Sequence, residues 1–161
     1  MIFTTPTTPT TPAAPGQDAE AIKASYFWPE ISPAAAREAM RLTGTVSGMR
    51  LRHALVEAIA SVNAELADWR VRQVATGYSS LQDVPTEQVD GQSVLVSRWV
   101  RAVYASAAAD LYERYRSFDT TGKAEKRADD EDSAADDLRR DARLAIRAIL
   151  GVTGGCVVEL I

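Results

Sequence analysis

The stretch that decides the fold reads Ser93-Val-Leu-Val-Ser-Arg-Trp-Val-Arg-Ala-Val-Tyr-Ala-Ser-Ala-Ala-Ala-Asp-Leu-Tyr-Glu-Arg-Tyr-Arg116. Apolar and aromatic residues recur along it, and just beyond it, every three or four positions, which places them on one face of an α-helix. These positions are Val96, Val100, Val103, Ala107, Leu111, Tyr115 and Phe118. The small residues of Ala105–Ala109 would let another helix come close, and Leu111–Arg116 ends the run with large Tyr and Arg side chains.

A second run with the same period follows the connection Phe118–Ala124 and ends near Gly151. Its repeating positions are Ala124, Ala128, Glu131, Ala135, Leu138, Ala142, Ala145 and Ile149. The N-terminal half of this run is almost entirely charged or small, so only the C-terminal half can bury much apolar surface. We therefore expect a helix that completes its packing on a neighbouring molecule.

Two helices are expected before these runs. Ser32 and Pro33 have the residue types of an N-cap and the first helical position, and a short helix to Leu42 would stop at Gly44. Ser47 can cap a longer helix to about Ala75, where about 28 residues would make a rod of about 40 Å. Its inward stripe would be Leu51, Leu55, Ala58, Ile59, Val62, Leu66, Trp69 and Gln73, with Gly77 as the C′ residue.

These patterns predict an all-α helical bundle of one short and three longer helices over residues 25–151. Residues 1–24 carry a Thr-Pro repeat that predicts a disordered arm, although a partner could order it. The loop Tyr78–Gln92, with a turn at Asp90-Gly91, would be pinned to the core by Leu81 and Val84, and Ser93 would cap the following helix. Residues 152–161 would form an extended tail.

Two segments each allow two interpretations. The three aromatic residues Tyr26, Phe27 and Trp28 could cover one end of the helical core or contact another subunit, because aromatic residues concentrate in interface cores. The apolar, β-prone end Cys156–Ile161 follows Gly154-Gly155, and it could fold back on its own core or dock on a partner.

The composition argues against several classes of function. A net charge of −4 gives no general attraction to nucleic acid, and a single cysteine rules out an intrachain disulfide and argues against a zinc cluster. No apolar run approaches the roughly 18 residues of a membrane helix, and the N-terminus lacks the pattern of a secretory signal.

No residue pattern indicates a catalytic site. His53 is the only histidine and is expected at the surface, and Cys156 has no neighbouring basic cluster to activate it. The acidic run Asp129–Asp132 would point around its helix instead of converging on a metal ion. We therefore expect no enzyme activity, no cofactor and no metal.

The chain resembles the head completion proteins (GPL family) of Peduovirus-type tailed bacteriophages. The resemblance is carried by short segments that keep their order and spacing over about Ala24–Ile161. They are Tyr26-Phe-Trp-Pro-Glu-Ile31, Met40-Arg-Leu42, Asn63-Ala-Glu-Leu66, Leu81-Gln-Asp-Val-Pro85, Asp90-Gly91, Leu111-Tyr-Glu-Arg-Tyr-Arg116 and the stretch Gly122–Leu138. The Thr-Pro arm shows no family pattern.

This resemblance implies a structural head–tail connector. Such a protein would form a dodecameric ring on the portal after DNA packaging, close the capsid vertex and support tail attachment. Its implied partners are the portal protein, copies of itself and a tail-side connector or tail terminator protein. Packaged DNA would pass the lumen without sequence-specific contact, and no membrane is involved. The implied location is the head–tail junction of the virion, and the host cytoplasm during assembly.

Two sets of residues would make these contacts. The apolar tail residues Val157, Val158, Leu160 and Ile161 would dock on the portal, and the subunit interface would use Tyr112, Tyr115, Arg116, Phe27 and Trp28. Alternating charges along Asp110–Arg116 and Arg139–Arg147 would add ion pairs between subunits.

The alternative is a small helical DNA-binding protein, similar to a terminase small subunit or a regulator. Such a protein needs a basic helix face near a turn. The cluster of Arg37–Arg41 with Arg50 and Arg52 is the candidate for that face.

Overall fold

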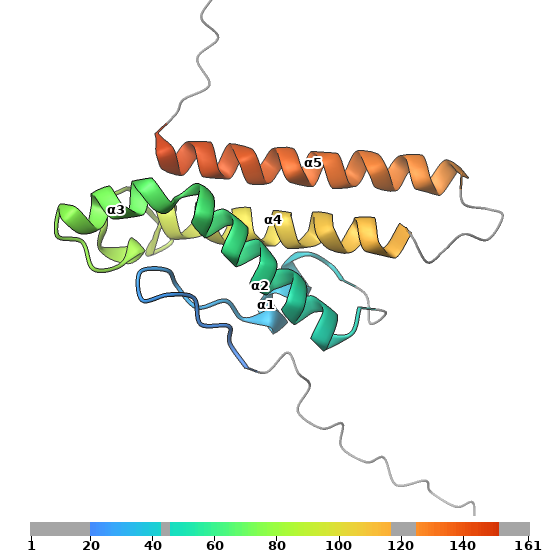
Figure 1. The fold of residues 1–161 in the computed structure, drawn as a ribbon, viewed down its shortest axis with the longest axis horizontal. Coiled ribbons are helices and arrows are strands. Elements are labelled where there is room, and N and C mark those ends of the chain that lie inside the picture. Colours follow the sequence, from blue (N-terminus) through green and yellow to red (C-terminus); the bar gives the residue numbers. More distant parts are fainter. Residues whose placement is uncertain (1–19, 43–45, 117–124, 152–161) are drawn as a thin grey trace, which may run out of the picture.

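The computed structural model describes residues 20–42, 46–116 and 125–151, and this part of the chain is mostly helical (Figure 1). Helix α4 (Val94–Arg116) lies in the middle, α5 (Glu125–Leu150) runs antiparallel along one side of it, and α2 (Gly48–Glu65) crosses another side. The remaining elements are α1 (Pro33–Ala39), α3 (Ala67–Ala75), a 3₁₀ turn η1 (Leu81–Asp83), and the antiparallel strands β1 (Gln88–Val89) and β2 (Gln92–Ser93).

Helix α4 is buried on more than the one side that its periodicity predicts. Val96, Val103 and Leu111 of the predicted stripe are buried, and Val100 is half-buried. Further buried residues lie around the helix at Leu95, Trp99, Ala102, Ala105, Ala108 and Ala109. Ala102 and Ala105 lie one helical turn after Arg98 and Arg101, and Ala108 and Ala109 lie one turn further on, so these alanines share a face with the two arginines. Both arginines bond to α5. Small side chains on that face let α5 lie close to α4.

In its described part, helix α5 buries a narrow apolar strip, and its remaining side chains there are half-buried or exposed. Within residues 134–150, the buried positions are Ala135, Ala142, Ala145, Ile146 and Ile149. Four of these, all except Ile146, are on the predicted stripe, and the predicted Leu138 is half-buried. The helix ends at Leu150, and Gly151 takes a φ of 74°, a conformation that favours glycine. The side chains of residues 125–133 lie outside the part that the structure describes.

The aromatic segment before α1 is packed into the core of its own chain. Phe27 meets Trp28 and Trp69 edge to face at ring-centroid distances of 5.0 and 6.3 Å, and Trp28 stacks on Trp99 at 5.5 Å. Phe27 and Trp28 are buried, as expected if they cover one end of the helical core. A contact with another subunit through these two rings would require the core to open. Only Tyr26 of this trio is exposed.

The packed part of the chain begins before the predicted boundary at residue 25. The backbones of Ile22 and Ile31 exchange two hydrogen bonds of 2.7 and 3.0 Å, and both side chains are buried. Residues that the sequence assigned to the arm therefore contribute to the core. Residues 1–19 and the tail 152–161 lie outside the described residues.

Helix α1 starts as predicted and ends earlier than predicted. The Ser32 hydroxyl accepts a hydrogen bond from the Ala35 N–H, and Pro33 follows the cap. The helix ends at Ala39, because Arg41 takes a φ of 52° and its N–H bonds back to the Glu38 carbonyl. Gly44, the predicted stop, lies outside the described residues.

The predicted rod from Ser47 to Ala75 is wrong in one respect, because it is divided into α2 and α3 at Leu66. Leu66 has φ −95° and ψ 5° and is fully buried, so the chain bends while its inward stripe continues to Trp69. Ser47 caps α2 as predicted. Gly77, with φ 106°, ends α3, where the Gly77 and Tyr78 N–H groups bond to the Val74 and Gln73 carbonyls.

The loop before α4 contains a 3₁₀ turn and a short β-hairpin, which the sequence patterns do not predict. Leu81 and Val84 are buried as predicted. Asp90 and Gly91 have φ values of 53° and 71° and connect β1 to β2 as a two-residue hairpin turn. The predicted cap at Ser93 is wrong: Ser93 pairs with Gln88 in the hairpin, and its buried hydroxyl has no hydrogen-bond partner among the described residues.

We predict that Trp99→Ala lowers the free energy of unfolding by about 3–5 kcal/mol, because it removes a fully buried ring that stacks on Trp28. It also leaves Asn63 without the indole N–H that it accepts at 2.9 Å. Urea unfolding followed by circular dichroism measures the loss. Tyr26→Ala, at a side chain that is 74% exposed, is the control and should change stability by no more than about 0.5 kcal/mol.

Candidate interaction surfaces

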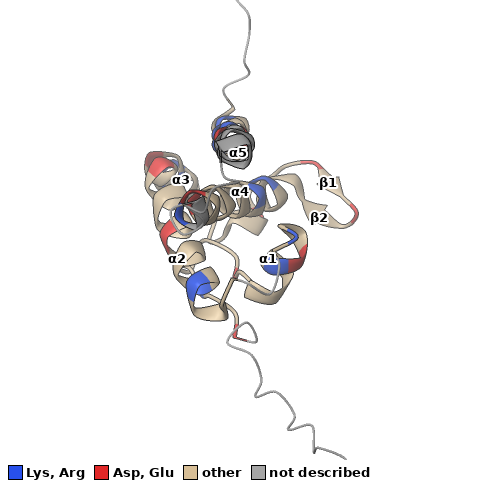
Figure 2. Ribbon diagram, turned by 90° about the vertical axis from the view of Figure 1, so that its right-hand side faces the viewer, with Lys and Arg blue, Asp and Glu red and all other residues tan. Residues whose placement is uncertain are grey.

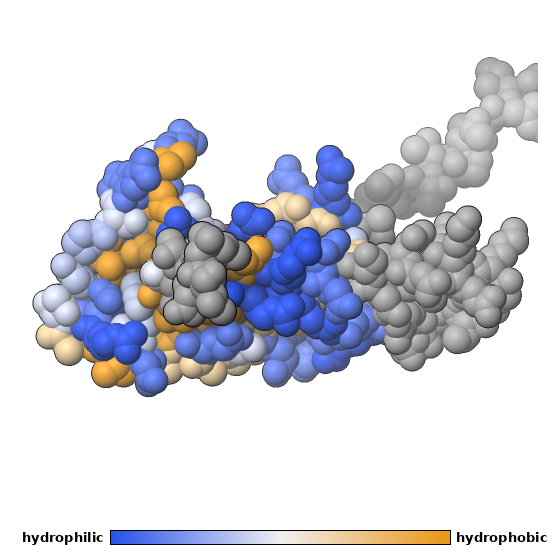
Figure 3. Space-filling view, turned by 90° about the horizontal axis from the view of Figure 1, so that it is seen from above, coloured by the Kyte–Doolittle hydropathy of each residue, from blue (hydrophilic) through white to orange (hydrophobic). Residues whose placement is uncertain are grey.

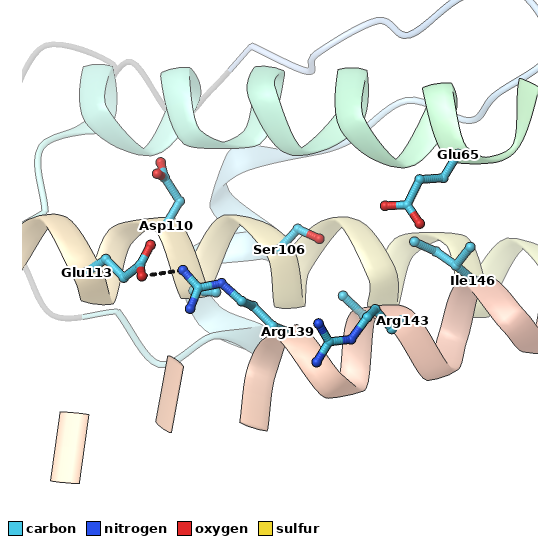
Figure 4. A pocket seen from close by; sticks show the side chains of 9 residues that line it. Glu65, Ser106, Asp110, Glu113, Arg139, Arg143 and Ile146 are labelled. Carbon is cyan, nitrogen blue, oxygen red and sulfur yellow. Dashed lines mark ion pairs between the residues drawn. The ribbon is translucent and has the colours of Figure 1, made fainter. Parts of the chain in front are cut away.

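A groove of about 350 Å³ lies where α2, α4 and α5 meet (Figure 4). Its apolar lining comes from Ala109, Ala142 and Ile146. Its charged lining is Glu65 from the end of α2, Asp110 and Glu113 from α4, and Arg139 and Arg143 from α5. The groove is therefore acidic on the side of α2 and α4 and basic on the side of α5.

Ion pairs tie α5 to α4 at this groove and on the opposite edge of the helix pair. Arg139 pairs with Glu113 across the groove and with Asp136 on its own helix. The hydrogen bond to Glu113 raises the pKa of the Arg139 guanidinium above its usual value, and Asp136 acts in the same direction. Arg101 pairs with Asp141 at 3.0 Å.

These pairs correct the expectation that the alternating charges would meet between subunits. Asp110 and Arg114 also pair with one another, at 3.0 Å along α4. Charges from both predicted charged segments are therefore engaged inside one chain. Because their side chains are partly exposed, each pair contributes about 0–1 kcal/mol.

Other charges at the groove are not neutralised. Glu65 and Arg143 form no ion pair with any residue in the described segments. One carboxylate oxygen of Asp110 is buried and has no hydrogen-bond partner there, while the other accepts from Arg114. This end of the α4–α5 pair therefore has unsatisfied polar groups beside a small apolar surface.

The residues predicted to contact other proteins lie in three different places: on the surface, in the core and outside the described part of the chain. Tyr112 lies on the exposed surface of α4 with 38% of its side chain accessible, as a contact residue requires. The side chains of Tyr115 and Arg116, and the tail residues Val157, Val158, Leu160 and Ile161, lie outside the described part. Phe27 and Trp28 are in the core, and we no longer include them in the subunit contact.

Two arginines of the basic cluster that favoured DNA binding bond to other parts of the same chain. Arg37 donates to the Val46 carbonyl at 2.9 Å, and Arg52 donates to the Glu20 carbonyl and pairs with its carboxylate. An arginine with an internal partner is less available for phosphate contacts. No specific observation therefore favours the DNA-binding alternative.

Neither the pattern of a metal site nor that of a membrane-spanning helix occurs in the described residues. They contain no group of three or more His, Cys, Asp or Glu side chains placed to hold a metal ion, and His53 is exposed as predicted. None of the helices within them combines the length and apolar character needed to cross a bilayer.

Comparison with known proteins places this sequence beside phage structural proteins. Residues 22–161 match the family described as phage head completion protein (GPL). A relative from Escherichia phage P2, the head completion/stabilization protein, is 44% identical over 144 residues, which cover 89% of this chain and 85% of the relative. No solved structure matches.

We predict that Arg139→Glu lowers the free energy of unfolding by about 1 kcal/mol, because a carboxylate then faces Glu113 at the groove. Adding Glu113→Arg should restore most of the loss. Denaturant unfolding at two protein concentrations makes the measurement. Since the pair is internal to one chain, the loss should not depend on protein concentration, and a loss that appears only at high concentration would assign the pair to a contact between chains.

Proposed function

The chain belongs to the phage head completion protein (GPL) family, and we propose that it forms a ring on the portal after DNA packaging, closes the capsid vertex and supports tail attachment. The observation that carries this proposal is the 44% identity to the head completion/stabilization protein of phage P2 over most of both chains. The family is one of structural proteins, and its role in head completion implies a place in the virion.

The shape of the described domain supports assembly into a ring. A closed ring needs a heterologous contact, in which two different faces of one subunit meet. Helix α5 lies on one side of the molecule and α2 on another, with α4 between them (Figure 2). Both helices keep one face exposed, so the domain has two separate faces for neighbours. We propose twelve copies, to match the symmetry of a portal vertex.

The subunit contact would include the end of α4. Tyr112 is exposed there, and Tyr115 and Arg116 follow it on the same helix. Tyr and Arg are enriched among residues that contribute most to binding, because they combine apolar area with directed hydrogen bonds. The mild negative charge of the chain suits a lumen through which DNA passes without adhering.

The portal contact would be made by the C-terminal tail. Helix α5 ends at Leu150, and Gly154 and Gly155 precede the apolar sequence Cys156–Ile161. Extended apolar segments of this length bind by adding a strand or by filling a groove. On the other side of the ring, a tail-side connector or tail terminator protein would complete the junction.

We predict that changing Val157, Val158, Leu160 and Ile161 to Ser leaves the helical content and the melting temperature unchanged but abolishes binding to portal rings. The reason is that these side chains would supply the apolar area of the portal contact. Co-sedimentation with purified portal measures binding, and circular dichroism measures the fold. Glu159→Gln, in the same tail, is the control that should still bind. Undiminished binding of the Ser variant would refute the tail contact.

We also predict that Arg116→Glu and Tyr112→Ala reduce the amount of ring formed on the portal at least about tenfold, while shifting the melting temperature by only a few degrees. Electron microscopy of portal complexes counts the rings. Arg114→Glu is the matched control, since Arg114 is exposed on the same turn and pairs within its own helix. A variant that unfolds would assign its residue to the core.

A further inference from the structure

Helices α2 and α3 carry much of the exposed apolar surface of the described residues. Eight large hydrophobic side chains are exposed among all the described residues. Half of them belong to α2 and α3: Met49, Val56, Val71 and Val74. A helix at the surface of a single domain normally turns charged residues outward. This outward surface is therefore not explained by the packing of one chain.

The outward face of α2 shows the pattern most clearly. Met49, Val56, Ala60 and Ala64 are all exposed, and their spacing of seven and four residues aligns them on the side away from the buried Leu55 and Val62. Met49 is 66% and Val56 is 45% accessible. We call these four residues the α2 strip.

The outward face of α5 is of the opposite character. Leu144 is 54% accessible, and exposed arginines surround it on the helix, Arg140, Arg143 and Arg147. Figure 3 looks onto this side of the molecule and shows hydrophilic residues over much of the middle. The long aliphatic stems of arginine can cover apolar surface while their charged ends meet carboxylates. We call Leu144 and these arginines the α5 face.

The charges that lack a partner on these two faces have opposite signs. Glu57 lies beside the α2 strip, is exposed and forms no ion pair with a described residue. Arg143 and Arg147 on the α5 face likewise form none. Contact between the two faces would pair these charges, whereas contact between two α2 strips would bring two Glu57 carboxylates together.

We propose that the α2 strip of one copy packs against the α5 face of the next copy, with Leu144 over Val56 and Ala60 and with Arg147 near Glu57. The inference rests on the proposed ring and names the contact that builds it. Because the two faces belong to different sides of the molecule (Figure 2), the contact is heterologous and can repeat around a ring.

Thiol cross-linking on the assembled portal tests this contact. In a Cys156→Ala background, which keeps a small apolar side chain in the tail and is first compared with the unmodified protein for portal binding, Ala60→Cys and Leu144→Cys are introduced singly and together. A short bismaleimide is then added to portal-bound protein. The double variant should give a ladder of covalent oligomers, and a mixture of the two single variants should give dimers only. Gln82→Cys with Leu144→Cys, which uses an exposed residue of η1, should give no ladder.

Charge reversal provides an independent readout. Glu57→Arg or Arg147→Glu alone should reduce ring formation at least about tenfold, and the two together should restore it. Two results obtained with protein still bound to the portal would overturn the inference: absence of the ladder, or a dimer from Ala60→Cys alone. Either result would leave the proposed function standing. If the unmodified protein fails to bind the portal, the proposed function fails and this contact falls with it. If only the Cys156→Ala background fails to bind, the charge-reversal variants, which keep Cys156, decide the contact.

Discussion

The close approach of α5 to the alanine-rich side of α4 is what holds α5 on the domain. Ala102, Ala105 and Ala109 give α5 room to lie near the α4 backbone. Small side chains also bury little area, so this seam gains less from the hydrophobic effect than a seam of leucines would. Ion pairs such as Arg101–Asp141 flank it and add modest stabilisation. Within residues 134–150, the side of α5 that carries Arg140, Leu144 and Arg147 stays exposed beside this seam.

A cluster of four aromatic rings organises the opposite side of α4. Trp99 extends from α4 to Trp28, and Phe27 links Trp28 to Trp69 on α3. One cluster therefore holds the segment before α1, the central helix and the end of the α2–α3 wall. Since these rings consolidate the domain, they are not available for contacts between subunits. The residues that remain for such contacts are on the outward faces of α2, α4 and α5.

Under the proposed function, the exposed outer faces of α2, α4 and α5 would be the surfaces that assembly covers. A domain with a consolidated aromatic core and exposed outer helix faces could join an assembly without rearranging its core. The ion pairs inside the α4–α5 hairpin have the same consequence, since they keep α5 in place before any partner arrives.

Local sequence patterns were enough to predict the helical class, the starts of α1 and α2, the end of α3 at Gly77 and the inward stripe from Leu51 to Trp69. Caps and periodicity act over a few neighbouring residues, so these features can be read without knowledge of distant contacts. The ordered short segments of the sequence also identified the family that the comparisons confirm. The break at Leu66 could not be predicted locally, because neither Gly nor Pro marks a bend there. In the fold, Leu66 is fully buried and Trp69, just after the break, packs against the distant Phe27. The internal pairing of Arg139 with Glu113 and the burial of Phe27 and Trp28 were likewise decided only by the tertiary structure. The physical reason is that each depends on residues far apart in sequence, and local propensity carries no information about which distant side chain will be the partner.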